Sequence, residues 1–275
     1  MKAFFSYFFG AGETQEFYYF SFAHFLPILL AAGVIYLIFR YRKQLAAVKN
    51  EKNIRLAMAF ICIVTEMSYF WRLVGVPTLE PHPTDHLPIT VCGWAIIFCS
   101  YLAVTKNQTL YDISYFWLFS GTLFALVTPA VLIYCGPTRF RFYQFWLEHT
   151  MGYIVIFYMT FVHGMRPHLK SIFKSIGALA VLTTVAIVAN TVLGDDANYL
   201  FLATTEDGAS VLDILPKSLP LKLLVMGAIV VVLFSLAYLP WYLIDRKAKQ
   251  KALVSELEAQ TEAESQTEAK TPVVK

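Results

Sequence analysis

Residues 142–164, FYQFWLEHTMGYIVIFYMTFVHG, decide where this chain resides and how it folds. The stretch is mostly apolar over about 20 residues, the length that an α-helix needs to cross the hydrocarbon of a bilayer. It nevertheless carries Glu148 and His149 well inside its length. An ionisable side chain at that depth costs roughly 3 kcal/mol or more, so such groups usually face a protein interior or a wet cavity. The stretch therefore predicts a membrane helix that contributes an acid and a histidine to a buried polar site.

Six more apolar stretches predict an all-α membrane fold, a bundle of seven transmembrane helices. The composition agrees, because 57% of the residues are hydrophobic and only 15% are charged, whereas a soluble domain has about 25% charged residues. The mean hydropathy is +0.56. We expect a multi-pass protein of the cell membrane whose partners are membrane lipids. The predicted spans are residues 18–40, 55–76, 87–105, 110–134, 142–164, 172–193 and 221–244.

The distribution of basic residues predicts the orientation, because short loops rich in lysine and arginine stay in the cytoplasm. The loop between the first two spans is strongly basic, which places the amino terminus outside and the carboxyl terminus in the cytoplasm. Arg139 and Arg141 are the one basic pair on the predicted outer side. Residues 1–9 are too short to span and are expected to lie at the interface. The basic loop holds Arg40, Arg42, Lys43, Lys49, Lys52 and Arg55.

The chain divides into a transmembrane domain, residues 1–251, and an acidic polar tail, residues 252–275, which we expect to be disordered because it has almost nothing to bury. A net charge of +3 without a basic cluster gives no reason to expect a nucleic-acid partner. The four cysteines show no C-x-x-C spacing, which argues against a zinc site or a disulfide framework. We predict no metal and no cofactor. The substrate and the oligomeric state are not determined by the sequence.

Glu66 is the second ionisable group expected deep in the membrane, about 16 Å from the start of its span at 1.5 Å per residue. It is either a hydrogen-bonded structural acid or a group that orients a neighbour such as His149. His24, just inside the first span, either joins this cluster or lines the interface. The longest external loop, residues 194–220, is a candidate cap over the bundle.

The third span opens with residues 87–94, LPITVCGW, and offers two nucleophiles. Pro88 suits the first turn of a helix, which would place Thr90 near the positive end of the helix dipole. A facing histidine can activate a hydroxyl or a thiol there. Thr90 and Cys92 lie about 200° apart on a regular helix, so at most one of them faces His149. The alternative for Thr90 is a hydroxyl bonded to its own helix.

Several short motifs resemble those of the YwaF-like family of bacterial integral membrane proteins. The resemblance covers nearly all spans and implies a polytopic membrane protein without an assigned activity. The matching pieces are Phe20-Ser21-x-x-His24, Leu87-Pro88 with Cys92, Gly121-Thr122-Leu123-x-Ala125-Leu126-x-Thr128-Pro129, Gln144 to His149, and Asn198-Tyr199-x-Phe201-Leu202.

More remotely, the chain is similar to a eukaryotic polytopic acyltransferase that remodels ether phospholipids, and to the transmembrane fatty-acid-ester hydrolases related to it. Those enzymes use a cysteine or threonine nucleophile and a histidine on separate helices, and the matching histidine is His149. The position that aligns with the acyltransferase cysteine holds Ile89, and Thr90 stands where that enzyme carries a histidine. The resemblance thus implies that Thr90 is the nucleophile, that Cys92 replaces it, or that the chain is not such an enzyme.

Three functions remain open on the sequence. In the first, the chain is a lipid acyltransferase or lipid-ester hydrolase, with His149 as base, Thr90 or Cys92 as nucleophile, and Glu66 or Glu148 orienting the imidazole. In the second, Glu66, Glu148 and His149 relay protons in a transporter or channel. In the third, the polar groups hold helices together in a membrane assembly protein.

Overall fold

The computed structural model describes the backbone of residues 2–194, 196–203 and 214–270, and the side chains of residues 4–194, 196–203 and 214–260. Over these ranges the chain is helical and contains no strand, which confirms the predicted all-α class. The helices are α1 (Lys2–Phe9), α2 (Phe22–Arg40), α3 (Arg42–Ala47), α4 (Glu51–Gly75), η1 (Pro77–Leu79), α5 (Pro83–His86), α6 (Val91–Thr105), α7 (Gln108–Trp117), η2 (Leu118–Thr122), α8 (Leu123–Val127), η3 (Ala130–Leu132), α9 (Phe140–His163), α10 (Leu169–Leu193), η4 (Tyr199–Phe201) and α11 (Leu219–Lys270).

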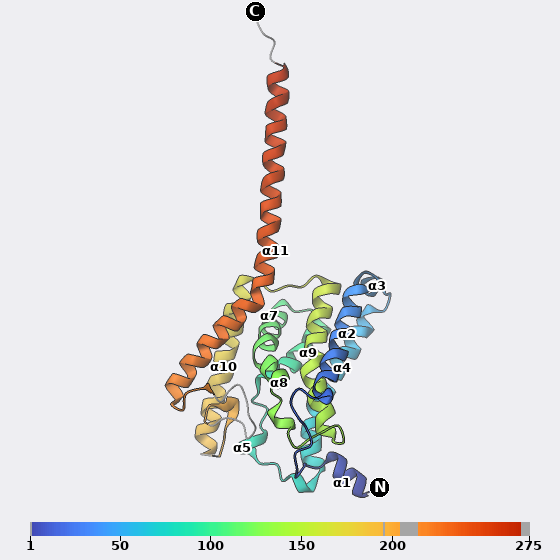
Figure 1. The fold of residues 1–275 in the computed structure, drawn as a ribbon, viewed down its shortest axis with the longest axis vertical. Helices are drawn as coiled ribbons and strands as arrows, with labels where there is room; N and C mark the ends of the chain where they lie inside the picture. The colour runs from blue at the N-terminus through green and yellow to red at the C-terminus, as the bar shows by residue number, and fades with distance from the viewer. Residues whose placement is uncertain (1, 195, 204–213, 271–275) are drawn as a thin grey trace, which may run out of the picture.

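Helix α9 lies at the centre of the bundle and packs against α2, α4 and α6 (Figure 1). Helix α10 packs against α7, and α11 crosses beside η2 before it leaves the bundle as a single long helix. The tyrosine hydroxyl of Tyr115 donates to the carbonyl of Ala237 at 2.9 Å and accepts from Trp241 at 3.1 Å, which ties α7 to α11. Two of the predicted site residues, Glu148 and His149, thus lie on the central helix α9.

Each of the seven predicted spans overlaps one of these helices, but not all seven helices have the length and composition of a membrane span. Within the described residues, five do: α2, α4, the continuous run Gln108–Val127, α10, and α11 as far as Gln260. Helix α6 is apolar but shorter, and α9 is the helix that carries the polar side chains. The structure thus supports a membrane protein with several apolar helices, while the count of seven spans and the orientation stay predictions.

Two predicted span boundaries are wrong, and proline explains both. The third helix begins at Val91 rather than at residue 87, so Pro88 precedes the helix instead of occupying its first turn. The fourth helix ends at Val127 rather than at residue 134, because Pro129 has no N–H to continue the hydrogen-bond ladder. Within that fourth run, η2 is a π-helical turn, a feature that is often found at functional sites.

Helix α11 also differs from the expected division at residue 251, since it continues without interruption to Lys270. The separate acidic tail therefore stays a prediction.

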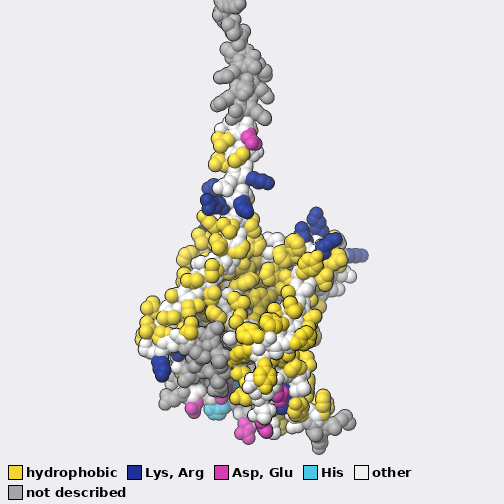
Figure 2. All heavy atoms as spheres, in the orientation of Figure 1, with side chains coloured by type: hydrophobic (Ala, Val, Ile, Leu, Met, Phe, Trp, Pro, Cys, Tyr) yellow, Lys and Arg dark blue, Asp and Glu magenta, His cyan; other side chains and the backbone are white. Residues whose placement is uncertain are grey.

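Charged side chains are unevenly distributed between the two ends of the bundle (Figure 2). Lysines and arginines gather where α11 leaves the bundle and near α3, whereas acidic and histidine side chains lie at the opposite end, with an apolar belt between them. We call these the basic end and the acidic end.

The predicted interfacial segment, α1, is held at the acidic end by two arginines that donate to backbone carbonyls near its carboxyl terminus. Arg72 of α4 donates to Phe9 at 2.6 Å and to Gly10 at 3.0 Å. Arg139 donates to Tyr7 and Ala11 at 2.8 and 3.0 Å. Positive charge at this end of a helix is favourable because the helix dipole is negative there. Arg139, a member of the basic pair on the predicted outer side, thus has a structural role.

Arg139 also forms an ion pair with Glu16 at 2.7 Å. The hydrogen bond from Arg139 holds the pKa of the Glu16 carboxyl below its usual value of 4.5.

The described part of the long loop between α10 and α11 caps the acidic end. The side-chain amide of Asn190 exchanges two hydrogen bonds with the backbone of Tyr199, at 2.8 and 3.1 Å. The Tyr199 hydroxyl accepts from the backbone N–H of Leu87 at 2.8 Å and donates to the carbonyl of Pro83. Since Leu87 begins the link into α6, the cap positions the start of the third predicted span. Residues 195 and 204–213 of the predicted cap lie outside the described residues.

The cap contains a strained turn that a buried lysine holds in place. Leu200 and Phe201 both have φ of 56°, a left-handed conformation that costs about 1 kcal/mol or more for a residue with a side chain. The ammonium of Lys222, which is only 2% exposed, donates to the carbonyls of Phe201, Leu202 and Ala203 at 3.1–3.3 Å. No carboxylate within the described residues pairs with this lysine.

Replacing Lys222 by methionine is expected to release the strained turn. The variant loses three charge-assisted hydrogen bonds and leaves the carbonyls without a donor, so we expect a loss of about 1–3 kcal/mol and a lower Tm in detergent or nanodiscs. Exposed Lys217 provides the matched control, because Lys217→Met removes the same charge from the loop residues just before α11. An equal drop in Tm for both variants would contradict the role of the carbonyl contacts.

The Glu16–Arg139 pair predicts a pH dependence of stability. Because the folded-state pKa is lowered, the pair stabilises the fold above the unfolded value of about 4.5, and this contribution is lost as the pH falls through the lowered value. Thermal unfolding measured from pH 6 to pH 3 should show a steeper loss of Tm in the wild type than in Glu16→Gln. Parallel curves for the two proteins would show that the pair has no such effect.

Candidate intramembrane polar site

Thr90 caps the amino terminus of α6, which confirms the alternative that its hydroxyl is bonded to its own helix. Its backbone is extended, with φ of −128° and ψ of 145°, and its Oγ1 accepts from the N–H of Gly93 at 3.1 Å. This bond satisfies one of the donors that a helix leaves unpaired at its start. Thr90 therefore lies at the positive end of α6, as predicted, but immediately before the helix rather than inside it.

Glu66 of α4 lies against this same helix start. A Cβ added at Gly93 would meet Glu66 Oε1 at 2.6 Å and Thr90 Oγ1 at 2.8 Å, so both oxygens border one point. Glu66 is buried, with 5% of its surface exposed. A carboxylate is favoured beside a helix amino terminus because the free N–H groups and the helix dipole are positive there. Gly93 thus leaves the space in which the acid and the threonine hydroxyl become neighbours.

A polar network on α9 faces Glu66 from the other side. The amide of Gln144 donates to Glu148 Oε2 at 2.9 Å and to the carbonyl of Thr65 at 3.3 Å, and its oxygen accepts from Arg141. Arg141 lies 3.6 Å from the same Glu148 oxygen. Both Glu148 and Arg141 interact electrostatically with Glu66. Glu148 and Glu66, the two predicted acids, therefore interact with each other and with the same arginine, Arg141.

Arg141 is a site residue that the sequence indicated only indirectly. It appeared there as one of two basic residues on the wrong side of the predicted topology. The structure shows its guanidinium 4.8 Å from the centre of the Tyr69 ring, with Gln144 and Glu148 as its polar partners. Tyr69 in turn exchanges a hydrogen bond of 2.9 Å with His86 Nδ1. The signal for Arg141 in the sequence was its position on the predicted outer side, where the loop-charge rule leads us to expect few basic residues.

His149 is buried next to this network and its ring is oriented by its own helix. The imidazole stacks on Phe145, with ring centres 4.0 Å apart, and Nδ1 lies 2.8 Å from the Phe145 carbonyl oxygen. A carbonyl can only accept, so the neutral ring carries its proton on Nδ1 and Nε2 is the basic nitrogen. Among the described residues no hydrogen bond to Nε2 is recorded. His149 interacts electrostatically with Glu148 and Arg141.

Cys92 faces a different side of α6 from Thr90, as the 200° separation predicts. The hydroxyl of Thr122 in η2 donates to its sulfur at 3.6 Å. The η2 turn in turn packs on α9, where the Tyr153 hydroxyl donates to the Leu118 carbonyl. Cys92 also interacts electrostatically with Tyr153, which lies one turn after His149 on the same face. Cys92 therefore lies where α6 meets η2 and α9, whereas Thr90 lies on the side of α6 that faces α4.

Hydrogen bonds between helices fix the relative depth of these residues. Helices α6 and α9 run in the same direction, since both are antiparallel to α4, and the thiol of Cys99 donates to the carbonyl of Gly152 at 3.8 Å. At 1.5 Å per residue, His149 then lies about 6 Å deeper than Cys92 and about 9 Å deeper than Thr90. Because the two helices run in the same direction, the lean of side chains toward the helix amino terminus shifts the imidazole and the Cys92 thiol alike. Thr90 is therefore the more distant of the two nucleophiles from His149 in depth.

His24 does not join the cluster. Its Nδ1 accepts from the Phe20 N–H at 3.0 Å, and Nε2 donates to the Leu126 carbonyl at 2.8 Å. That carbonyl lacks its usual helical donor because Ala130 bonds to Thr128 at the proline break. His24 therefore closes α2 onto the end of α8 as a structural residue.

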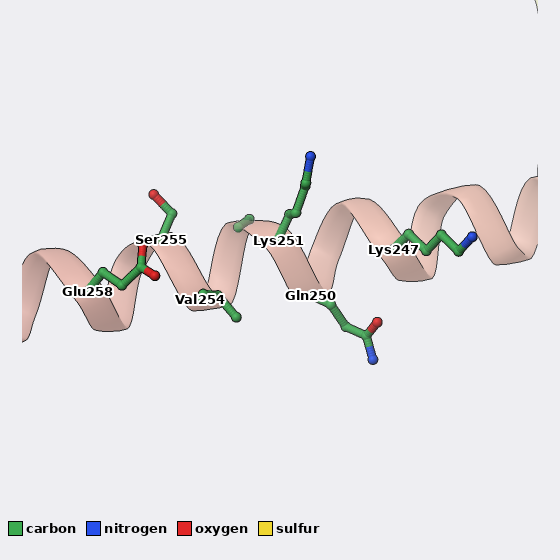
Figure 3. Close-up of a pocket in the computed structure, with 7 residues that line it drawn as sticks. Lys247, Gln250, Lys251, Val254, Ser255 and Glu258 are labelled. Carbon is green, nitrogen blue, oxygen red and sulfur yellow. The ribbon is translucent and has the colours of Figure 1, made fainter.

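No group of three or more histidine, cysteine or acidic side chains suited to a metal occurs among the described residues. A hollow elsewhere lies along one exposed stretch of α11, where Lys247, Gln250, Lys251 and Val254 project in different directions from a single helix (Figure 3). It is open and far from the polar residues, so it is not a candidate for their substrate.

The contact at Gly93 predicts a specific effect of adding a methyl group. Gly93→Ala displaces both the Glu66 carboxylate and the capping hydroxyl of Thr90, so we expect a loss of about 1–3 kcal/mol in thermal or denaturant unfolding. Combining Gly93→Ala with Glu66→Ala removes one of the two clashing oxygens and should recover part of that loss. In Gly33→Ala, the matched control in α2, the new Cβ meets nothing within 4 Å. Additive losses in the double variant would contradict the contact.

Comparison with known proteins places the whole bundle in one family. The TMEM164 family model matches residues 19–238, a range that runs from before α2 to within α11 and includes every residue of the polar site. No curated protein and no solved structure matches the chain. The expected YwaF-like name and the remote likeness to an acyltransferase receive no support from these comparisons. The chain belongs to the TMEM164 family of transmembrane proteins.

Proposed function

We propose that this membrane protein catalyses acyl transfer or ester hydrolysis on membrane lipids, with His149 as the general base. The observation that carries the proposal is the orientation of the His149 ring. Its bond to the Phe145 carbonyl leaves Nε2 as a basic nitrogen without a recorded partner. Histidine in that tautomer is the usual base for activating a thiol or hydroxyl nucleophile. Placement in the cell membrane, with the basic end in the cytoplasm, is part of the same proposal.

Cys92 is a better candidate nucleophile than Thr90. The Thr90 oxygen is engaged by the Gly93 N–H and borders Glu66, and it lies farther in depth from His149. Cys92 is half-buried, occupies the first turn of α6 and accepts a hydrogen bond from Thr122. A helix amino terminus and a hydroxyl donor both stabilise a thiolate, which is the reactive form of cysteine. Cys92 and His149 differ in depth by about one helical turn, so the reaction requires a movement that brings the thiol to Nε2.

The reaction follows from these groups. His149 Nε2 takes the proton of the Cys92 thiol, and the sulfur attacks the carbonyl carbon of a lipid ester. The bond from that carbon to the lipid alcohol breaks, and the alcohol leaves with the proton from His149, so the acyl group is held on sulfur as a thioester. A second alcohol, or water, then attacks the thioester carbon while His149 takes its proton; the bond from carbon to sulfur breaks, the sulfur of Cys92 regains the proton from His149, and the product is a new ester or a free fatty acid. Glu148 stabilises the imidazolium electrostatically.

The continuity of the polar groups favours proton-coupled transport as the second candidate. His86, Tyr69 and Arg141 lead from the acidic end toward Glu148 and Glu66. Ionisable residues in such a series are typical of proton relays. In a membrane assembly protein the polar groups would only hold helices together, and this function gives no role to the basic nitrogen Nε2 of His149.

Lipid analysis of a strain that lacks the gene, complemented with variants, tests the proposal. We expect that neither Cys92→Ala nor His149→Ala restores the wild-type lipid composition in the deletion strain. Loss of a general base alone typically lowers the rate by a factor of about 10² or more. An alkyne fatty acid should label the wild-type chain at Cys92 through a bond that hydroxylamine cleaves, and it should not label Cys92→Ala.

The controls are Cys135→Ala and His163→Gln, which remove a thiol and an imidazole outside the site; both should restore the lipid composition. If Thr90→Ala fails while Cys92→Ala restores the lipids, Thr90 is the nucleophile. A deletion that leaves lipid composition unchanged would contradict catalysis and favour transport.

A further inference from the structure

The neck of α11, where this helix leaves the apolar belt, carries four basic residues within six positions: Arg246, Lys247, Lys249 and Lys251. The only acid beside them, Asp245, is already bound to Arg166 at 2.7 Å. Among the described side chains, residues 4–194, 196–203 and 214–260, no carboxylate forms an ion pair with any of the four. The neck therefore presents positive charge that no described carboxylate pairs with.

The four charges form an incomplete ring around the helix instead of a single narrow stripe. At 100° per residue, Arg246, Lys247 and Lys249 point in three different directions and Lys251 lies about 40° from Lys247, so the charges cover roughly 200° of the circumference. Figure 3 shows Lys247 and Lys251 projecting from α11 into open space. A protein or nucleic-acid groove would contact one side of such a ring. A planar surface through which the helix passes would contact all of it.

The ring is also at the right height for a membrane surface. Ile244, the last of the apolar residues before it, is followed by the basic positions within about 3–10 Å along the axis, a distance comparable to the Debye length of about 8 Å at physiological salt. In Figure 2 the basic side chains follow directly on the apolar belt. Lysine and arginine clusters next to a membrane helix attract anionic lipid head groups.

The sequence beyond the neck has the opposite sign. Glu256 and Glu258 follow on the same helix, and Glu262, Glu264 and Glu268 continue the acidic composition. These positions begin about 8 Å beyond Lys251 along a helix, and an anionic surface repels them. The same lipid head groups that attract the neck would thus hold the far part of α11 away from the membrane.

We propose that the neck of α11 binds anionic phospholipids of the leaflet at the basic end, and that this contact, together with repulsion of the acidic segment, holds the helix upright on the membrane. The inference does not depend on the proposed enzymatic function. It concerns a different part of the chain and a different ligand.

Energy transfer from tryptophan to a dansyl head-group label tests the proposal on the native chain, because Trp241 lies just before the neck. Full-length protein is placed in phosphatidylcholine vesicles that contain a few per cent of either dansyl phosphatidylserine or dansyl phosphatidylcholine. We expect transfer to the serine lipid to exceed transfer to the choline lipid by about threefold at low salt, and to approach equality at about 1 M salt.

The variant in which Arg246, Lys247, Lys249 and Lys251 are all replaced by glutamine should lose this preference. Lys43→Gln, Lys49→Gln and Lys52→Gln, combined, form the control, since they remove exposed charges of the basic end away from α11 and should retain most of it. Equal transfer to both lipids in the wild type, or an unchanged preference in the neck variant, would overturn the proposal. Binding of a short RNA by the neck, without a lipid preference, would assign the ring to nucleic acid and overturn it as well.

Discussion

The structure depends on one constraint: helix α9 carries more polar and ionisable side chains than a membrane helix can expose to lipid. Arg141, Gln144, Glu148 and His149 occupy two consecutive turns, and hydrocarbon offers them no hydrogen bonds. The bundle resolves this by enclosing α9 between α2, α4 and α6. Side chains from α4 and the carbonyl groups of the backbone supply the missing partners. The apolar helices α10 and α11, which have no such demand, lie farther out and bury little of their surface.

The enclosure also explains why the start of α6 is irregular. Helix α6 must bring its amino terminus against the carboxylate of Glu66, and only a residue without a side chain leaves room for it at Gly93. Thr90 then serves as the cap, and the chain before it is fixed by the Tyr199 hydroxyl. The packing of α4, α6 and α9 thus brings together Glu66, Glu148, Arg141 and the amino terminus of α6. Of these groups, the proposed reaction uses Glu148 and the amino terminus of α6, whose first turn carries Cys92.

Much of this could be predicted from the sequence, because apolar length and the cost of buried charge act locally. The helical class, the approximate place of each helix and the enclosure of Glu66, Glu148 and His149 within the bundle follow from those two rules. The exact helix boundaries could not be predicted. How far Pro88 and Pro129 displace the start of α6 and the end of α8 depended on which backbone carbonyls found other donors. The pairing of Glu66 with Thr90, and of Cys92 with Thr122, could not be predicted either. It depends on how three helices are rotated about their axes, which no single segment specifies.

The shortness of α6 has a consequence for the lipid around it. Fifteen residues rise about 22 Å, whereas the hydrocarbon of a typical bilayer is about 30 Å thick. For a helix of this length to cross the bilayer, the membrane beside it would have to become thinner, or its polar interface would have to dip toward the protein, at a cost of about a fraction of a kcal/mol per ångström. The glycerol region of nearby lipids would then descend toward Cys92. Bilayers built from short acyl chains would meet the helix with less deformation than bilayers built from long ones.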